Sequence, residues 1–334
     1  MKKVILLLFF ASFAAWHHQQ SGTVERLRAV SIVNKNTVWA SGNKGTFTRT
    51  TDGGKSWTSG IVVGAEELDF RDVEAFDQKR AYLLSIGQGE MSRIYATEDG
   101  GKNWKLLYKN RDPKAFFDGF AFWDSNNAVA FGDPVDGKLL VIKTTDGGKN
   151  WQKVENIPDS LPEESAFAAS GTSIVTEGKS NAWIATGGSA ARVFRSTDRG
   201  SSWVVSSTPI ISGNESSGIF SLAFRDALHG VAVGGDYKEP DKQKQLVAIT
   251  NDGGVSWKLA NKQPGGYRSS VSYVSSYRQK TSLVAVGPNG SDYSTDDGLT
   301  WHKLSEEGFH SVDFQNFFGW AVGDAGRIYH QKID

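Results

Sequence analysis

The sequence predicts an all-β fold, a single seven-bladed β-propeller whose blades are four-stranded antiparallel sheets and whose last blade is closed by the N-terminal strand. Three observations predict it. An eight-residue motif recurs six times, two strand-like runs precede each copy, and the C-terminus ends in a partial repeat that lacks one strand. A repeat of roughly 40–50 residues is typical of propeller blades.

The motif consists of a small hydroxyl residue, any residue, Asp, any residue, Gly, two variable residues and Trp. Its first copy covers residues 50–57, and by subtraction the spacings between successive motif tryptophans are 47, 47, 52, 54 and 44 residues. The motif aspartates are Asp52, Asp99, Asp146, Asp198, Asp252 and Asp296. The motif tryptophans are Trp57, Trp104, Trp151, Trp203, Trp257 and Trp301. Chance does not produce six such copies at blade-length spacing.

The residue types in the motif suit a hairpin turn. A turn Asp accepts hydrogen bonds from nearby backbone N–H groups, Gly adopts the positive φ of a tight turn, and Trp covers the turn with a large apolar face. Each aspartate belongs to a separate repeat, on an equivalent outer turn. We therefore interpret the motif aspartates as structural, and not as a metal site or a catalytic array.

The partial repeat at the C-terminus predicts how the ring closes. Residues 308–330 repeat the first three strands of a blade, and the chain stops before a seventh motif. Residues 16–20, Trp-His-His-Gln-Gln, resemble the strand that follows other motifs, such as residues 104–107. We expect this N-terminal strand to complete the last blade, because pairing the two chain ends removes an open sheet edge.

The N-terminus has the layout of a secretory signal peptide. Lys2 and Lys3 precede an apolar run over residues 4–10, and small residues follow. This run is shorter than the roughly 20 residues needed to span a bilayer. The sequence predicts a signal peptide over residues 1–15 and a propeller over residues 16–334, in a protein that is exported to the periplasm or secreted.

Composition narrows the functional classes. The chain has 37 Lys plus Arg, 37 Asp plus Glu and no Cys. Because the charges balance, the chain has no net positive field that would attract nucleic acid or an acidic membrane. Because it has no cysteine, catalysis or metal binding by a thiolate is excluded. The six histidines lack metal-binding spacing, and no glycine-rich phosphate loop opens a helix. We therefore expect no metal, no cofactor and no nucleic-acid partner.

The six motifs, the opening segment over residues 21–31 and the following strand over residues 38–42 resemble the Asp-box (BNR-like) repeat propellers. The resemblance is closest to the family of photosystem II assembly and stability factors and its bacterial relatives. It covers nearly all of residues 16–334. It implies a non-enzymatic scaffold that docks on a protein partner, such as a membrane-complex subunit, through an arginine-rich surface.

The variable connections supply a candidate binding face. The turns over residues 132–137 and 235–244 should share one end of the ring with the loops that join blades, opposite the motif turns. Aromatic and arginine residues there are candidate anchors, because such residues dominate interface energetics. The candidate residues are Arg28, Arg71, Phe117, Asp118, Asp133, Arg192, Asp236, Tyr237, Tyr267, Arg268 and Arg327.

Two functions remain open. The first is an exported, monomeric binding scaffold with no catalytic residues. The alternative is a carbohydrate-active enzyme or lectin, sialidase-like or glycoside hydrolase-like, which needs two carboxylates about 5–9.5 Å apart. Loop carboxylates that fit this alternative are Asp118, Asp133, Glu164, Glu215 and Asp236. Clustered carboxylates in a deep pocket favour the enzyme, and a shallow basic or aromatic face favours the scaffold.

Overall fold

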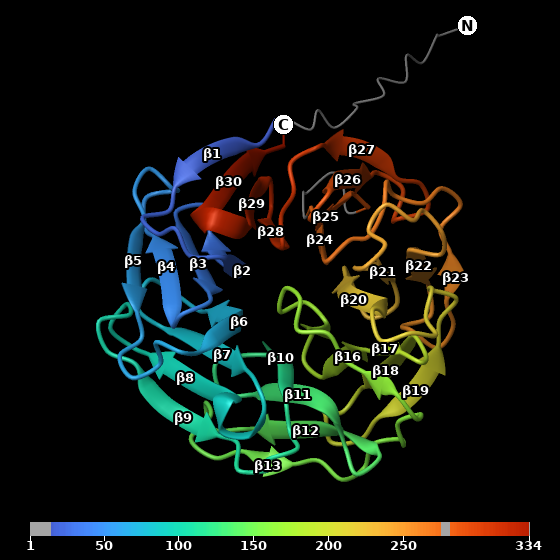
Figure 1. Cartoon of the computed structure of the whole chain (residues 1–334), viewed down its shortest axis with the longest axis horizontal. Helices are drawn as coiled ribbons and strands as arrows, with labels where there is room; N and C mark the ends of the chain where they lie inside the picture. The colour runs from blue at the N-terminus through green and yellow to red at the C-terminus, as the bar shows by residue number, and fades with distance from the viewer. Residues whose placement is uncertain (1–14, 275–280, 334) are drawn as a thin grey trace, which may run out of the picture.

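The computed structural model describes residues 15–274 and 281–333. Seven antiparallel blades follow one another in a ring, whose centre we name the central channel, and the two ends of the described chain lie side by side in the ring (Figure 1). The seven-bladed prediction is confirmed. The described helices are two short 3-10 turns, η1 (Gly89–Met91) and η2 (Asp324–Gly326), and neither is long and apolar enough to cross a membrane.

The strands of each blade are given from the channel outward. The first blade contains β2 (Leu27–Asn34), β3 (Thr37–Gly42), β4 (Thr46–Thr50) and β5 (Thr58–Ile61). The second contains β6 (Asp69–Ala75), β7 (Ala81–Ile86), β8 (Arg93–Thr97) and β9 (Lys105–Lys109). The third contains β10 (Phe117–Phe122), β11 (Ala128–Val135), β12 (Lys138–Thr144) and β13 (Gln152–Lys153). The fourth contains β15 (Ile174–Glu177), β16 (Asn181–Ala185), β18 (Arg192–Ser196) and β19 (Val204–Ser207).

The remaining blades follow the same plan. The fifth contains β20 (Ser217–Phe224), β21 (Gly230–Asp236), β22 (Val247–Thr250) and β23 (Lys258–Leu259). The sixth contains β24 (Ser270–Tyr273), β25 (Leu283–Gly287), β26 (Gly290–Ser294) and β27 (His302–Ser305). The seventh contains β28 (Ser311–Gln315), β29 (Phe318–Val322), β30 (Arg327–Lys332) and, as its outer strand, β1 (His17–Gln20).

The N-terminal strand closes the ring, as the sequence predicts. Strand β1 pairs antiparallel with β30, from His17 opposite His330 to Gln20 opposite Arg327. Trp16 is 9% exposed and packs on Phe309, with ring centroids 5.2 Å apart. Of the predicted signal peptide over residues 1–15, residues 1–14 lie outside the described residues, so that part remains a prediction.

The hydrophobic core lies between neighbouring blades. Val129 and Phe131 of the third blade, for example, form one buried cluster with Ile184 and Phe194 of the fourth. A strand that is buried on both faces has a continuous run of apolar residues in its sequence. This explains why the middle strands of the blades are rich in Val and Ala. Each blade is therefore stabilised by both of its neighbours, and the ring depends on closure.

The six motifs form the turns between the third and fourth strands of their blades. In the first, Thr50 Oγ1 donates to Asp52 Oδ1 (2.8 Å) and accepts from the backbone N–H of Gly54 (2.9 Å). Asp52 also accepts from the hydroxyl of Ser56 at Oδ2 (2.6 Å) and from the backbone N–H of Ser56 at Oδ1 (3.0 Å). The two bonds from Ser56, followed by the bond from Thr50, lower the pKa of Asp52 to about 2. The same local bonds recur at Asp99, Asp146, Asp198, Asp252 and Asp296. Each motif carboxylate is thus bonded within its own turn.

Replacing a motif aspartate should loosen one blade. In Asp252→Ala, the backbone N–H of Ser256 and the hydroxyl of Thr250 lose their acceptor. We expect the melting temperature to fall by roughly 2–4 °C, the shift typical of a loss near 1 kcal/mol in a protein larger than about 150 residues. Thermal unfolding followed by circular dichroism measures it, with Glu67→Ala as the exposed control. An unchanged melting temperature would contradict the structural role of the motif.

One segment departs from the regular plan. After β13, the short strand β14 (Glu164–Ser165) pairs with β17 (Gly187–Gly188), and together they extend the sheet of the fifth blade to six strands. Residues 166–172, named here the channel plug, then enter the central channel, where Figure 1 shows a lime-green loop. Ser170 of the plug donates to Ser269 O (2.8 Å), and Ser311 donates to Ser170 O (3.1 Å). The plug is therefore fixed to inner strands on the far side of the ring.

Candidate functional site

The two ends of the ring carry different connections. In an antiparallel blade, the turn between the third and fourth strands lies at the end opposite the loops between second and third strands. The loops that join blades lie at the same end as the second-to-third loops. We name this end the loop face, and the motif turns occupy the other end.

A pocket of about 510 Å³ opens on the loop face where the inner strands begin, and we name it the central pocket. Six of the candidate residues predicted from sequence line it: Arg28, Arg71, Asp118, Asp133, Tyr237 and Tyr267. Plug residues 166–169 form another part of its wall. The pocket thus collects residues from several blades around the channel.

Two arginines dominate the electrostatics of the pocket. Arg71 donates to the plug carbonyl of Ala168 (2.8 Å) and forms an ion pair with Asp69 (2.7 Å). Arg28 donates to the carbonyl of Ala169 (2.8 Å), but among the described residues no carboxylate lies within 4.0 Å of its guanidinium group. Its buried Nε has no hydrogen-bond partner. Burial, followed by the nearby charge of Arg71, lowers the pKa of Arg28 to about 9. The charge of Asp69 partly opposes this fall in pKa, but no carboxylate of the described chain pairs directly with Arg28.

The carboxyl groups in the pocket are held towards their neutral form. Asp118 is 1% exposed, and burial, followed by the charge of Asp133, raises its pKa well above the usual range. Burial also raises the pKa of Asp133, which accepts from the backbone N–H of Ala166 in the plug (2.9 Å). Burial and the charge of Arg28 lower the pKa of His310 to about 4, so this ring is uncharged near neutral pH.

Aromatic rings form the remaining wall. Phe167 of the plug stacks on Phe220 of β20, with centroids 4.0 Å apart and planes 8° apart. Tyr267 meets Phe220 edge to face at 4.7 Å, and Tyr237, which is 46% exposed, approaches both phenylalanines at the rim. Such a wall accepts apolar or aromatic groups beside the arginines.

Several candidate residues lie outside the pocket. Phe117 is completely buried between the second and third blades, and its neighbour Phe116 lines the pocket instead. Arg192 forms a buried ion pair with Glu164, and Arg268 forms one with Asp292. Neither arginine is available as a surface anchor, because both guanidinium groups are satisfied in the interior.

Two further candidate residues form hydrogen bonds with residues of nearby loops and do not line the pocket. Asp236 accepts from Ser216 Oγ (2.7 Å) and from the backbone N–H of Lys238 (2.9 Å), which shapes the long loop after β21. Arg327 donates to Asp324 O (3.2 Å) at the start of β30, outside the pocket lining.

The sequence analysis did not predict three residues that line the central pocket: Phe167, Phe220 and His310. The long spacing between Trp151 and Trp203 was the available signal for the plug that carries Phe167.

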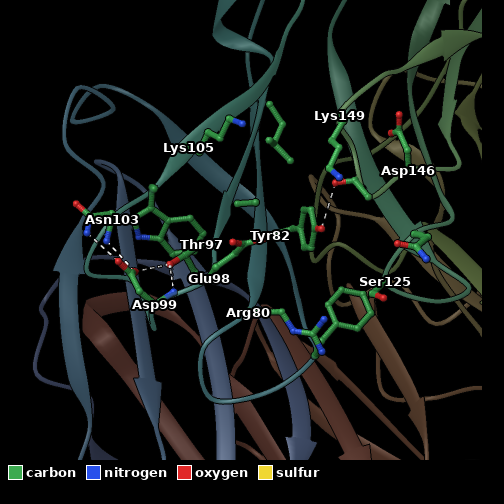
Figure 2. Close-up of a pocket in the computed structure, with 16 residues that line it drawn as sticks. Arg80, Tyr82, Thr97, Glu98, Asp99, Asn103, Lys105, Ser125, Asp146 and Lys149 are labelled. Carbon is green, nitrogen blue, oxygen red and sulfur yellow. Dashed lines mark hydrogen bonds between the residues drawn. The ribbon is translucent and has the colours of Figure 1, made fainter.

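A second hollow, of about 600 Å³, lies on the outer side of the ring between the second and third blades (Figure 2). Its polar groups serve the motif turns: Asp99 accepts from Asn103 Nδ2 (2.7 Å), and Tyr82 donates to Gly147 O (3.2 Å), as Figure 2 shows. The first bond lies within a motif turn, and the second joins β7 of the second blade to the motif turn of the third, so the hollow is a seam between two blades. Across the described residues, no group of three His, Asp or Glu side chains is arranged to hold a metal ion.

Two half-buried acids on the inner strands β6 and β28 should make stability depend on pH. Burial raises the pKa of Glu74 to about 8, with a further contribution from Asp313, whose own pKa burial raises to about 6. Because folding favours their neutral form, the contribution of these two groups to stability is fully present below the unfolded pKa near 4.5 and is lost as pH rises towards 8. We expect Glu74→Gln to raise the melting temperature at pH 8 by several degrees and to change it little at pH 4.5. Thermal unfolding across this range tests it, and an unchanged pH slope would contradict it.

Comparison with solved structures shows the fold. No protein-family model matches the chain, and no curated protein matches it. The fold is similar to that of YCF48. The structure described as YCF48 bound to D1 peptide aligns with a TM-score of 0.67 at 15% identity, over 96% of this chain and 95% of that one. YCF48 from Cyanidioschyzon merolae aligns with a TM-score of 0.62 at 18% identity, over 95% and 98%. An ancestral GH74 enzyme aligns with a TM-score of 0.66 at 13% identity, over 95% of this chain and 46% of that enzyme.

Proposed function

We propose that this protein is an exported, non-enzymatic binding scaffold that docks an acidic segment of a partner protein in the central pocket. One observation carries the proposal: the guanidinium group of Arg28 lies in an aromatic pocket with no carboxylate within 4.0 Å in the described chain. A partly buried cation without a directly paired counter-ion is costly, and an anionic partner would reduce that cost. The partner therefore contributes the missing negative charge.

The rest of the pocket supports the same function. Its aromatic wall provides the kind of anchor surface that dominates protein interfaces, and Arg71 adds a second guanidinium beside Arg28. The similar structure of YCF48 was determined with a D1 peptide bound. In line with the sequence resemblance to assembly factors, the proposed partner is a subunit of a membrane complex, bound by a monomeric propeller during assembly.

A carbohydrate ligand is the second candidate function. Asp118 and Asp133 both line the central pocket, and the ancestral GH74 enzyme has a similar propeller. The unpaired arginine favours the scaffold, since a neutral glycan supplies no charge to compensate it. A screen of glycan hydrolysis with the wild type and Asp133→Asn separates the two, because activity that Asp133→Asn abolishes would replace the scaffold proposal.

The scaffold proposal predicts that Arg28→Met weakens partner capture. Methionine keeps an apolar stem in the pocket but removes the charge and its hydrogen-bond donors, so affinity should fall at least about tenfold. Affinity capture from the native envelope, followed by titration of the captured protein, measures the effect. Arg327→Met is the matched control, because Arg327 lies outside the pocket lining. Equal capture by the wild type and Arg28→Met would contradict docking in this pocket.

A further inference from the structure

The seventh blade lacks the motif turn that connects the two outer strands in each of the other blades. In those six blades the turn joins the third strand to the fourth. In the seventh blade, the outer strand β1 and its neighbour β30 come from segments far apart in the chain: by subtraction, His330 follows His17 by 313 residues. Noncovalent contacts alone therefore hold these two strands together at the motif end of the ring.

Two histidines occupy the open end of this strand pair. His17 lies directly opposite His330, at the register position that adjoins the motif turn in the other blades. Opposite residues of an antiparallel pair share one face of the sheet, with Cβ atoms about 4.5–5.5 Å apart. At the same position, the other blades pair Arg49 with Thr58, Ala96 with Lys105, Lys143 with Gln152, Arg195 with Val204, Ile249 with Lys258, and Tyr293 with His302. Of the seven such pairs in the described chain, the one without a turn contains two imidazole rings.

The surroundings of the two rings leave their nitrogens available. His330 is half-buried and packs against Trp320, with ring centroids 4.5 Å apart, which fixes its position on the blade. His17 is exposed to solvent. Within the described chain, neither imidazole forms a hydrogen bond. Burial, followed by the charge of His17, lowers the pKa of His330, and this effect of one ring on the other requires them to lie close together.

We propose that His17 and His330 together bind one zinc ion, which links β1 to β30 where the other blades have a motif turn. Two imidazole nitrogens on tetrahedral zinc are about 3.3 Å apart, a separation that histidines on opposite strands can reach. Water completes the coordination, and a site with two protein ligands binds zinc reversibly. The sequence analysis judged histidines by their spacing along the chain, whereas ring closure creates this pair. The site is separate from the central pocket, whose lining contains neither histidine.

Calorimetric titration of chelator-treated protein with Zn²⁺ tests the two ligands. We expect the wild type to bind one ion per chain and His17→Ala to bind it at least about tenfold more weakly. His330→Phe should cause the same loss, while its ring keeps the packing against Trp320. The matched control is His18→Ala, because His18 is also exposed on β1 but lies opposite Tyr329, on the other face of the sheet. Mg²⁺, which prefers oxygen ligands, should not bind at this pair. Unchanged affinity in His17→Ala, or an equal loss in His18→Ala, would overturn the proposal.

Thermal unfolding shows whether the ion stabilises the closed ring. Zinc that binds only where β1 and β30 are paired stabilises the folded state, so about 1 mM Zn²⁺ should raise the melting temperature of the wild type by at least about 3 °C. The melting temperature of His17→Ala should not rise. In chelator, the two proteins should melt at similar temperatures, because His17 is exposed. An equal rise in both proteins, or no rise in the wild type, would contradict a zinc link between these strands.

Hydrogen exchange locates the effect within the ring. Strand β1 is an outer strand held at its motif end without a turn, so its backbone N–H groups report local opening of the seventh blade. We expect Zn²⁺ to slow exchange in β1 of the wild type and to leave β5, the outer strand of the first blade, unchanged. In His17→Ala, Zn²⁺ should change neither strand. Slower exchange in β1 of His17→Ala, or in β5 as much as in β1, would overturn the proposal.

Discussion

Deleting residues 16–22 should destabilise the ring more than any single substitution at its surface. The deletion removes β1, which supplies the outer strand of the seventh blade, together with Trp16 from the cluster around Phe309. It also removes Gln19, whose Oε1 accepts from Trp57 Nε1 and Trp320 Nε1, both at 3.1 Å. We expect the melting temperature to fall by at least about 10 °C, because four backbone pairs and a buried tryptophan are lost together.

Urea unfolding and thermal unfolding measure this effect. The matched control replaces His17 and His18 with threonine, which keeps the strand and its backbone pairing but changes two side chains that are exposed in the ring. The control should retain most of the stability of the wild type. If the deletion melted at the same temperature as the wild type, the ring would not depend on this strand.

Arg192→Ala should produce the second large effect. The Glu164 side chain is 0% exposed, and Arg192 Nε donates to its Oε1 (2.9 Å) while Nη2 donates to its Oε2. Thr186 Oγ1 (2.6 Å) and the backbone N–H of Leu161 (2.8 Å) remain after the substitution, but the counter-charge is lost. Breaking a buried ion pair by removing one partner typically costs about 3–5 kcal/mol, so we expect a loss of that order.

A double variant separates charge from packing. In Arg192→Ala combined with Glu164→Gln, no charge remains to be buried, so stability should recover part of the loss. Because Glu164 lies in β14, directly before the channel plug, Arg192→Ala should also weaken ligand binding in the central pocket. Denaturant unfolding of the wild type, both single variants and the double variant tests this. Additive losses would contradict a coupled pair.

The repeat predicted most of the fold from sequence because each blade is specified locally. The motif turn, the glycine-terminated strands and the missing fourth strand all belong to segments shorter than one blade. Closure by β1 followed from counting strands, and the register with β30 confirms it. The loop face was predictable for the same reason, since antiparallel pairing determines which connections share an end of the ring.

Some residues that the sequence predicts on the binding face lie elsewhere in the structure, because contacts between distant segments determine their positions. Arg192 and Arg268 bind carboxylates 28 and 24 residues away, and no local pattern identifies such partners. At the start of β10 the prediction is wrong by one residue: Phe116 lines the central pocket, and Phe117, which was predicted to do so, is buried. The channel plug has neither a motif nor strand periodicity, so only the long spacing between blades indicated it.

Site-specific photo-crosslinking tests the central claim most directly. A photoreactive phenylalanine analogue at Tyr237, which is 46% exposed in the wall of the central pocket, should crosslink to the bound partner. The same analogue at Lys102, in a motif turn at the opposite end of the ring, should not. Crosslinking at position 102 without crosslinking at position 237 would show that the partner docks on the motif end and would contradict the account.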